Sequence, residues 1–571
     1  MLDNNKQHFI IYLIKSCITS LRQEFLGGIL FTTLYIFAQL YLTFYYKALF
    51  DKPLSYKEEN NFILITTSFI TLTWVAITLF QYFQGIVSAS LFPKIRSHVM
   101  VKIFDIIKGK NFEFYTKHSP NTIKDAVYNI ALSLEKVIQI LILSIYPFVV
   151  ILVIYSIILL KLSILLFLAN IAFITLLFFL IFNYRASNLA ISYKAARSHA
   201  LLSNYLADFS NNIIFTNFIT KKDKEIERFK FFLSNSTNDY RVVLQNIEQY
   251  KTKQSILTSL YYVLLFYFVI SIYSNQLISF GNAILVMMLS FQMINMIWNI
   301  NFNILALNKE IGTLKEAAEL FYSQSTDHAQ LDIISNNSNC QHPYYIDIQN
   351  VSLLINQKQT LKNISLCIKP YSKIGIIGQS GTGKSTLLKL ILGLYESYEG
   401  QILINNIELK QYNIEEYRLK FSIVEQDPYL LNRSLLENVY YGSIFTNMSD
   451  FFSAKVIKLF GCTELLGTTK NKDSIVNCKQ LSFGQRKRIL LARAFIRDTP
   501  FVILDEPLSG FNLMDKQEIH NTIEELSHGK TLIYTSHEPD FLNNMDIIIK
   551  MHDGKIQEVI KNEDLNCCTS R

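Results

Sequence analysis

Apolar and polar positions divide the chain into two parts. Up to about residue 308, long apolar runs alternate with polar stretches, whereas after Tyr344 short apolar runs are separated by polar and amphipathic segments. A bilayer core of roughly 30 Å requires about 20 apolar residues in helical conformation. Six stretches meet this requirement: approximately residues 25–46, 62–90, 139–160, 162–182, 257–274 and 283–305. The pattern predicts a membrane α-helical bundle of six transmembrane helices, followed by an α/β domain.

The polar stretches predict how the helices are oriented. Lys and Arg are concentrated between the second and third runs and between the fourth and fifth, while residues 274–282 carry no charge. Because Lys and Arg are retained on the cytoplasmic side, both basic stretches and the α/β domain are expected in the cytoplasm. Lys161 alone separates the third and fourth runs, so a tight outer turn is expected there. We expect a multi-pass integral protein of a bacterial inner (plasma) membrane.

The two basic stretches show helical periodicity of their own. FPKIRSHVMVKIFDIIKG and NYRASNLAISYKAARSHALLSNYLADF place apolar residues three and four positions apart. This spacing favours long cytoplasmic extensions of the membrane helices over the alternative of disordered basic loops. Near the N-terminus, the apolar patch Phe9–Ile14 has no small-residue cleavage site after it, which favours an interfacial helix over a signal peptide.

Composition narrows the range of partners. Half of the 571 residues are hydrophobic, and the formal net charge is +8. Such a charge suits nucleic acid, an anionic membrane surface or cytoplasmic loops, and here most of the surplus flanks the apolar runs. Membrane lipid is therefore an expected partner and nucleic acid is not. The seven cysteines form no zinc-ligand spacing and are expected to be reduced, with Cys567 and Cys568 in a flexible tail.

A glycine-rich motif opens the soluble half. The residues from Gly378 to Ser385 fit G-x-x-x-x-G-K-[ST], after an apolar strand and before an amphipathic helix. Backbone amides of such a loop surround phosphates, Lys384 reaches the β and γ phosphates of ATP, and the Ser385 hydroxyl binds Mg²⁺. The predicted ATP-binding residues of this loop are Gly378, Gln379, Ser380, Gly381, Thr382, Gly383, Lys384, Ser385 and Thr386.

Two further strands end in chemically active side chains. FVILDEP places Asp505 and Glu506 directly after an apolar run, and TLIYTSHEP places His537 after another. A surface carboxylate pair is the simpler interpretation of the first, but the strand context favours a site. Asp505 would then hold Mg²⁺ through water, and Glu506 would polarise an attacking water.

Taken together, these motifs resemble an ABC transporter half-subunit of the exporter type over nearly the whole length. The resemblance implies that Glu506 is the general base and His537 the switch histidine, and that Gln426 links the metal site to the membrane domain. LSFGQ, from Leu481 to Gln485, matches the signature motif. It implies that Ser482, Gly484 and Gln485 contact the ATP of a second subunit, and that Ser385, Gln426 and Asp505 form the metal site. Residues 115–123 and 203–212 match, by position, the loops that contact the ATPase domain.

The resemblance also implies a domain plan and an activity. We expect a transmembrane domain over residues 1–312, a linker over 313–342, a nucleotide-binding domain over 343–562 and a flexible tail over 563–571. The implied activity is ATP hydrolysis driving export or flipping of a hydrophobic or amphipathic substrate. An importer on the same scaffold and an ATP-switched regulator or channel are the alternatives. A homodimer is favoured because nothing essential is missing, with a heterodimer as the alternative.

Four departures from the family pattern concern the nucleotide site. Ile355 stands where an aromatic residue usually stacks on adenine, Asn512 replaces the Asp of the loop after the catalytic Glu, and DSIVNCKQ lacks the usual Gly and Glu. Phe483 interrupts the signature motif, which is tolerable if its φ is negative and its ring turns away from the nucleotide.

The predicted spans contain amides and aromatic rings instead of buried charges. The amides are Gln39, Gln81, Gln84, Gln292, Asn295, Asn299 and Asn303, and Trp298 lies among the last of them. Such groups suit a lipid, a hydrophobic drug or a peptide as cargo. The alternative is that they hydrogen-bond the helices to one another.

Overall fold

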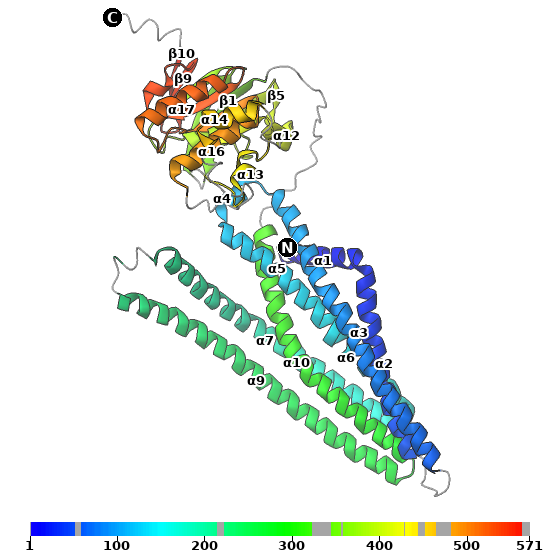
Figure 1. The fold of residues 1–571 in the computed structure, drawn as a ribbon. Helices are drawn as coiled ribbons and strands as arrows, with labels where there is room; N and C mark the ends of the chain where they lie inside the picture. The colour runs from blue at the N-terminus through cyan, green and yellow to red at the C-terminus, as the bar shows by residue number, and fades with distance from the viewer. Residues whose placement is uncertain are drawn as a thin grey trace, which may run out of the picture. The chain divides into compact units, whose positions relative to one another are not determined.

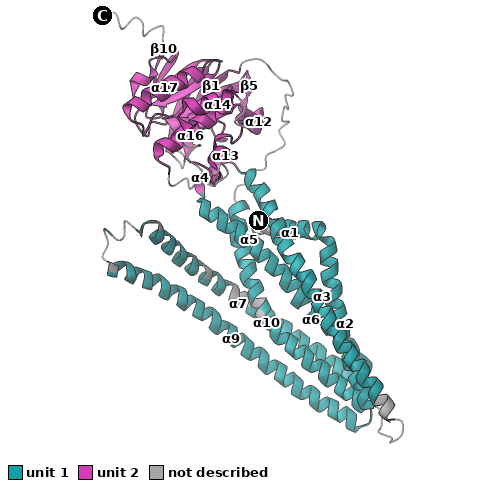
Figure 2. Cartoon of the chain, viewed as in Figure 1, with its two compact units in different colours: residues 1–110, 118–325 teal, residues 111–117, 326–571 magenta. Residues whose placement is uncertain are grey.

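The protein divides into two compact units in a computed structural model. A helical unit comprises residues 1–110 and 118–325, and an α/β unit comprises residues 111–117 and 326–571 (Figure 2). The residues that the structure describes are 2–51, 59–213, 218, 222–322, 344–355, 358–427, 429–443, 451–463 and 481–561. Most of the predicted linker, the DSIVNCKQ stretch and the predicted tail lie outside the described residues.

Long helices build the first unit (Figure 1). They are α1 (Leu2–Ser20), α2 (Arg22–Asp51), α3 (Glu59–Lys108), α5 (Pro120–Ile140), η1 (Leu141–Ile145), α6 (Tyr146–Leu162), α7 (Ile164–Asn211), α9 (Lys222–Ser274) and α10 (Phe280–Tyr322). Among the described residues, six helical segments are long and apolar enough to cross a membrane. Each overlaps one of the six predicted spans, so the predicted number and order of spans are confirmed. The predicted helical extensions are confirmed as well, since α3 continues to Lys108 and α7 to Asn211.

Two local features shape the third and fourth spans. Ser163 is extended, with φ −163° and ψ 132°, and it separates α6 from α7, which confirms the tight turn predicted beside Lys161. Between α5 and α6, η1 is a π-helical turn just before Pro147. Proline lacks an N–H and its ring collides with the carbonyl four residues earlier, so a wider turn accommodates it without ending the helix.

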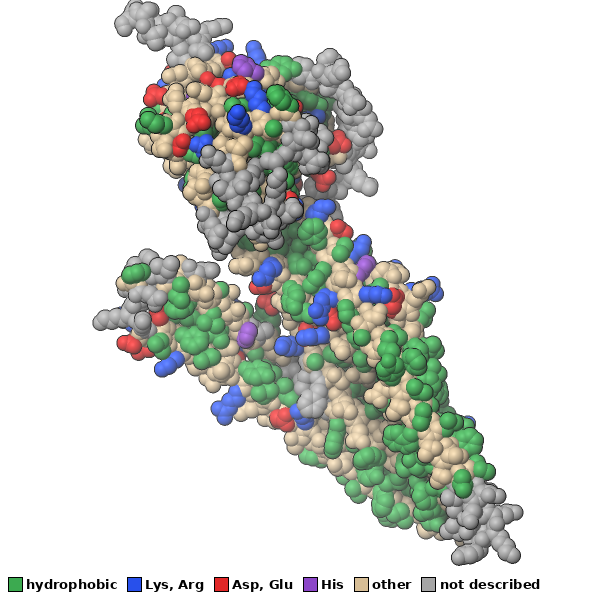
Figure 3. All heavy atoms as spheres, viewed as in Figure 1, with side chains coloured by type: hydrophobic (Ala, Val, Ile, Leu, Met, Phe, Trp, Pro, Cys, Tyr) green, Lys and Arg blue, Asp and Glu red, His purple; other side chains and the backbone are tan. Residues whose placement is uncertain are grey.

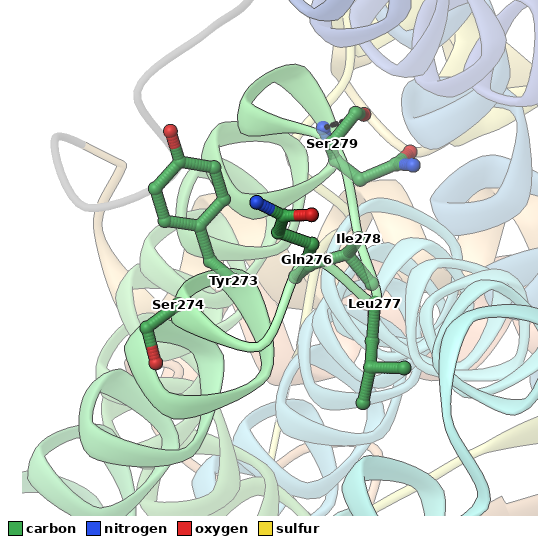
Figure 4. A pocket seen from close by; sticks show the side chains of 7 residues that line it. Tyr273, Ser274, Gln276, Leu277, Ile278 and Ser279 are labelled. Carbon is green, nitrogen blue, oxygen red and sulfur yellow. Dashed lines mark hydrogen bonds between the residues drawn. The ribbon is translucent and has the colours of Figure 1, made fainter.

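A short turn joins α9 to α10 at the uncharged connection. Gln276 takes the left-handed conformation with φ 56°, and the side chains around this turn line a shallow pocket (Figure 4). Ser279 Oγ accepts a hydrogen bond from Asn282 N, and Asp51 Oδ1 accepts one from Gly281 N at 2.8 Å. The amides at the start of α10, which have no partner within the helix, are therefore satisfied in part by α2.

Side chains of α2, α6, α7, α9 and α10 pack into the core of the helical unit. Within it, Tyr155 OH lies 2.7 Å from Ser290 Oγ and 3.2 Å from Tyr261 OH, and Tyr261 OH donates to Asn170 Oδ1. Hydrophobic side chains cover the end of the unit where the helices converge, and Lys and Arg gather toward the other end (Figure 3). This separation agrees with a membrane-embedded part and a basic part outside it.

The α/β unit contains two sheets and surrounding helices. Its elements are α4 (Phe112–Lys117), β1 (Ile346–Ile355), β2 (Lys358–Ile368), β3 (Lys373–Ile377), α11 (Lys384–Ile391), β4 (Glu399–Ile404), β5 (Ile407–Glu408), η2 (Leu409–Gln411), α12 (Ile414–Arg418), β6 (Phe421–Val424), α13 (Leu435–Val439), α14 (Phe451–Leu459), α16 (Phe483–Ile496), β7 (Phe501–Asp505), α17 (Leu513–Leu526), β8 (Thr531–Ser536), η4 (Pro539–Leu542), β9 (Ile547–His552) and β10 (Lys555–Lys561). The smaller sheet is antiparallel, in the order β2-β1-β4-β5. The larger has the order β10-β9-β3-β8-β7-β6.

The middle of the larger sheet is parallel. β3 pairs with β8 and β9, and β7 pairs with β8 and β6, all in parallel. These strands are short apolar runs buried on both faces, which is typical of a parallel sheet covered on each side. The carboxyl ends of β3, β8, β7 and β6 consequently lie along one edge, where ligands usually bind in such folds.

The segment from Asn111 to Lys117 groups with the α/β unit although it lies far from it in sequence. The Phe112 ring packs edge-on against Tyr395 with 5.7 Å between centroids, and Lys389 Nζ lies 5.3 Å from the Phe112 ring centroid. Phe114 is buried. This contact is made just before residues 115–123, the predicted contact loop, while residues 203–212 lie at the end of α7 and their contact stays a prediction.

Candidate active site

The predicted site residues follow four neighbouring strands. The loop Gly378–Thr386 follows β3, His537 follows β8, Asp505 and Glu506 lie at the end of β7, and Gln426 follows β6. Since these strands are parallel and adjacent, their carboxyl ends bring together residues that are up to 159 positions apart. The sheet therefore assembles one site from the four motifs.

Two positions of the phosphate loop require glycine, one because of its backbone conformation and one because of close packing. Gly383 caps α11 with φ 101°, a conformation that side chains other than glycine rarely adopt. At Gly378, a Cβ atom would lie 2.6 Å from the carbonyl oxygen of Met551. Within the loop, Thr382 Oγ1 donates to the carbonyl oxygen of Gln379 at 2.8 Å. Ser385 and Thr386 begin α11, and Ser380 and Gly381 form the exposed turn before it.

Lys384 lies inside the loop. Its Nζ donates to the Gly378 carbonyl oxygen at 2.6 Å and lies 3.5 Å from His537 Nε2. Burial lowers the pKa of the Lys384 ammonium, and the nearby Glu506 and Asp505 carboxylates oppose this shift. A positive charge thus lies at the start of α11, where the first amides have no partner within the helix, and this is a favourable arrangement for phosphate.

Glu506 occupies the centre of the site. Its Oε1 lies 2.6 Å from His537 Nε2, and its Oε2 accepts a hydrogen bond from Gln426 Nε2 at 3.0 Å. Glu506 thus contacts the two other residues that were assigned to catalysis and to metal linkage. A carboxylate held on both oxygens has a fixed orientation, as a group that must direct a water molecule requires.

The backbone at Glu506 is strained. Its φ is 47°, an uncommon value for a residue with a long side chain. Glu506 N donates to Thr535 Oγ1 at 2.9 Å, and Thr535 Oγ1 donates to Asp505 Oδ1 at 2.7 Å. Thr535 was not among the predicted site residues, yet it holds both acidic residues. Its position opposite Asp505 on the neighbouring strand was the available signal.

The predicted metal ligands form an all-oxygen donor set. Ser385 offers a hydroxyl, Asp505 a carboxylate and Gln426 an amide oxygen, because the Gln426 amide nitrogen already donates to Glu506. Oxygen donors of this kind suit Mg²⁺. Among the described residues, no three His, Cys, Asp or Glu side chains are grouped so that they could hold a metal. This donor set therefore fits an ion that shares its coordination with phosphate and water.

Lys487 was missed in the sequence, although it lies in the helix that follows the signature motif. Its side chain is fully buried in α16, and Nζ donates to the Gln426 carbonyl oxygen at 2.8 Å and to Ser509 Oγ at 3.4 Å. Burial lowers the pKa of Lys487 to about 8, against the opposing effect of Asp505 and other acidic groups. Lys487 therefore ties α16 to the loops that follow β6 and β7.

The signature residues form the start of α16. Ser482 Oγ accepts a hydrogen bond from Gln485 N at 3.2 Å, and Gln485 Oε1 accepts one from Ser482 N at 2.9 Å. This reciprocal capping fixes the serine hydroxyl at the helix start, beside Gly484. Phe483 is the first helical residue and is not among the described residues with positive φ, so its backbone is unstrained.

Ile355 ends β1, opposite Lys358 of β2. Its side chain is half-buried against the core of the antiparallel sheet. The assignment of Ile355 to nucleotide binding stays a prediction.

Comparison with known proteins covers both parts of the chain. Residues 361–509 match the family described as "ABC transporter". The ATP-dependent lipid A-core flippase of Hahella chejuensis is 32% identical over 212 residues, 36% of each chain. The heterocyst differentiation ATP-binding protein HepA of a Nostoc species is 34% identical over 204 residues, 35% of this chain and 33% of that protein. The chain thus aligns with only about a third of the length of these relatives.

A solved structure matches over almost the whole length. It is described as a bacterial Atm1-family ABC exporter with ATP bound, and it aligns with a TM-score of 0.86 over 96% of this chain and 97% of the other, at 18% identity. The predicted fold, six membrane helices followed by an α/β P-loop domain, is confirmed. The predicted resemblance is confirmed too, by the family match in the α/β unit and by the fold of the full chain.

Proposed function

We propose that this chain, which has the fold of an ABC exporter half-subunit and an ABC transporter family domain at residues 361–509, uses ATP hydrolysis to export or flip an amphipathic substrate. The single observation that carries the proposal is the contact of Glu506 with both His537 and Gln426 beside the phosphate loop. A degenerate site would lack one of these groups. The proposed location is a bacterial inner membrane, with the α/β unit in the cytoplasm.

The site residues have separate roles in hydrolysis. The loop Gly378–Thr386 and Lys384 bind the phosphates, and Glu506 orients water toward the γ-phosphate while His537 holds the carboxylate in place. Mg²⁺, held by Ser385, Asp505 and Gln426, would neutralise charge on the β and γ phosphates. Little covalent work is required, because the reaction depends on positioning and on electrostatic stabilisation.

A second copy of the chain is the proposed partner. Ser482, Gly484 and Gln485 lie at the exposed and half-exposed start of α16, where a phosphate of another subunit can approach. Both halves of the proposed shared site are present in one sequence, which favours a homodimer over a heterodimer. In such a dimer each ATP lies between the phosphate loop of one chain and α16 of the other.

One face of α10 carries side chains that favour an amphipathic substrate. Phe291 and Trp298 are 61% and 49% exposed, and the exposed amides Asn295 and Asn299 lie on the same side at helical spacing. Other amides serve the alternative role, since Gln292 donates to Gln39 and Gln84 donates to Thr32. The exposed face of rings and amides suits a lipid-like molecule with a polar head, and the flippase relatives agree with this class.

Replacement of the central carboxylate tests the proposal. Glu506→Gln keeps the size of the side chain and its contact with Gln426 but removes the negative charge that polarises water. We expect steady-state ATP hydrolysis by the purified protein in lipid nanodiscs to fall by about 100-fold or more, on the scale of losing a main catalytic group. ATP binding, measured with a fluorescent analogue, should persist. Turnover at the parent rate in Glu506→Gln would contradict the assignment.

Transport is tested separately from hydrolysis. Proteoliposomes with the α/β unit outside should move a fluorescent lipid between leaflets only with ATP and not with Glu506→Gln. The exporter fold favours outward movement over the importer alternative. ATP hydrolysis without any movement of lipid would favour the regulator or channel alternative.

A further inference from the structure

Two aromatic rings and two glycines interlock between α16 and the loop that follows Glu506. A Cβ atom at Gly510 would lie 2.5 Å from Cδ1 of Phe483, and a Cβ atom at Gly484 would lie 3.2 Å from Cε1 of Phe511. Each ring therefore fills the space that a side chain on the opposite glycine would need. Gly510 has φ 83°, a conformation that residues other than glycine rarely adopt.

Charged side chains add to the contact between α16 and the loop that follows Glu506. Lys487 Nζ donates to Ser509 Oγ at 3.4 Å and lies 5.7 Å from the centroid of the Phe483 ring. The Arg488 guanidinium lies 5.6 Å from the centroid of the Phe511 ring. Arg488 also forms an ion pair with Asp515 at 2.9 Å. The start of α16 is thus connected to residues 509–515 at several points, and each connection lies within one chain.

The loop that contacts α16 is hydrogen-bonded to the proposed catalytic residue Glu506. Ser509 directly precedes Gly510, and its Oγ donates to the Glu506 carbonyl oxygen at 2.9 Å. Glu506 already has a strained backbone, which only a well-determined surrounding maintains. A displacement of residues 509–511 would therefore reach Glu506 through one hydrogen-bonded turn.

We propose that Phe483 is a positioning residue, which by resting on Gly510 fixes the loop after Glu506 to the start of α16 in the same chain. The proposal rests on the function proposed above. Phe483 in LSFGQ and Gly510 in the loop SGFN (Ser509 to Asn512) then form one matched pair, because the ring requires the glycine. The pair sets the position of this chain's Glu506 relative to its own Ser482, which serves the partner's ATP.

A double-mutant cycle tests this pairing in the full-length protein in nanodiscs. The variants are Phe483→Gly, Gly510→Ala and both together, with kcat and KM for ATP and the Tm without nucleotide measured for each. Each single change should lower kcat by about tenfold to 100-fold at nearly constant KM, since a misplacement of about 1 Å in a catalytic group costs on this order. The double variant should lose little more kcat and Tm than Phe483→Gly alone, because the new methyl group no longer meets a ring.

Two matched controls separate the contact from general effects. Gly529 also has a positive φ, 74°, but a Cβ atom there would meet nothing within 4 Å, so Gly529→Ala measures the cost of the conformation alone. Phe451, like Phe483, is the first residue of a helix, but it is 88% exposed. Phe451→Gly therefore measures the effect of losing an aromatic ring at a helix start when that ring makes few contacts. Both controls should leave kcat near the parent value.

Three results would overturn the proposal. Equal costs of Gly510→Ala with and without Phe483 would show that the ring and the glycine do not interact. Non-additive effects of the two substitutions on Tm, with kcat unchanged in all variants, would show that Phe483 only fills space and does not position Glu506. A parent protein without ATPase activity would refute the proposed function and the positioning role together, whereas loss of coupling in an active protein would refute the positioning role alone.

Discussion

At the scale of single residues, the nucleotide site combines groups that sequence motifs identify with groups that they do not. The phosphate loop, Asp505, Glu506 and His537 each follow a strand in a recognisable pattern, so their places along one edge of the sheet were predictable. Thr535 and Lys487 were not, because their importance comes from neighbours on other strands and helices. The contact of Phe483 with Gly510 joins positions 27 residues apart, and neither residue alone indicates it.

Ile355 offers a test of base recognition. An aromatic ring stacked on adenine contributes roughly 1–3 kcal/mol, which an aliphatic side chain does not fully replace. Ile355→Tyr should therefore lower the Kd for ATP by about tenfold, which corresponds to about 1.4 kcal/mol, and increase the preference for ATP over GTP. Titration with a fluorescent ATP analogue, with GTP as competitor, measures both effects.

Ile355→Val is the control for this test. It keeps an aliphatic, β-branched side chain at the end of β1, so the Kd should change little. An unchanged Kd in Ile355→Tyr, with β1 and β2 intact by Tm, would remove Ile355 from the nucleotide site.

At the scale of elements, the start of α17 shows how a departure from the family pattern has a local role. Asn512 precedes α17, and its side-chain oxygen accepts a hydrogen bond from Asp515 N at 2.8 Å. Loss of such a cap costs about 1 kcal/mol. Asn512→Ala should therefore lower the Tm by about 2–4 °C, on the scale observed for domains of this size.

The matched variant Asn512→Asp keeps the cap and adds a favourable charge at the helix start, so its Tm should equal or exceed that of the parent. Differential scanning fluorimetry without nucleotide measures both variants. Equal Tm values for Asn512→Ala and the parent would show that the hydrogen bond contributes nothing to stability.

The helices of the membrane part were largely predictable, and the exceptions have physical causes. Apolar length gave six spans, and Lys161 marked the turn that Ser163 makes. The π-helical turn η1 was not predicted, because it depends on how the helix accommodates Pro147 without ending. The grouping of residues 111–117 with the α/β unit depends on the contact of Phe112 with Tyr395, which local periodicity cannot reveal.

At the scale of the whole molecule, the proposed shared site makes a specific prediction about mixed dimers. In a head-to-tail pair, each site uses the Glu506 of one chain and the Ser482 of the other. Glu506→Gln and Ser482→Arg should each inactivate both sites of a homodimer. A mixed dimer instead contains one site with both defects and one with neither, so about half of the parent ATPase activity should return if the two sites work independently.

Co-expression with two different affinity tags, followed by purification on both, isolates the mixed dimer for ATPase assay in nanodiscs. Activity in the mixed dimer but in neither homodimer requires that one active site draw residues from two copies of this chain, which a monomer or a self-contained site cannot explain. Mixed dimers as inactive as both homodimers would contradict independent shared sites. A protein that runs as an active monomer would contradict the pair itself, and activity appearing only with a different subunit would favour the heterodimer.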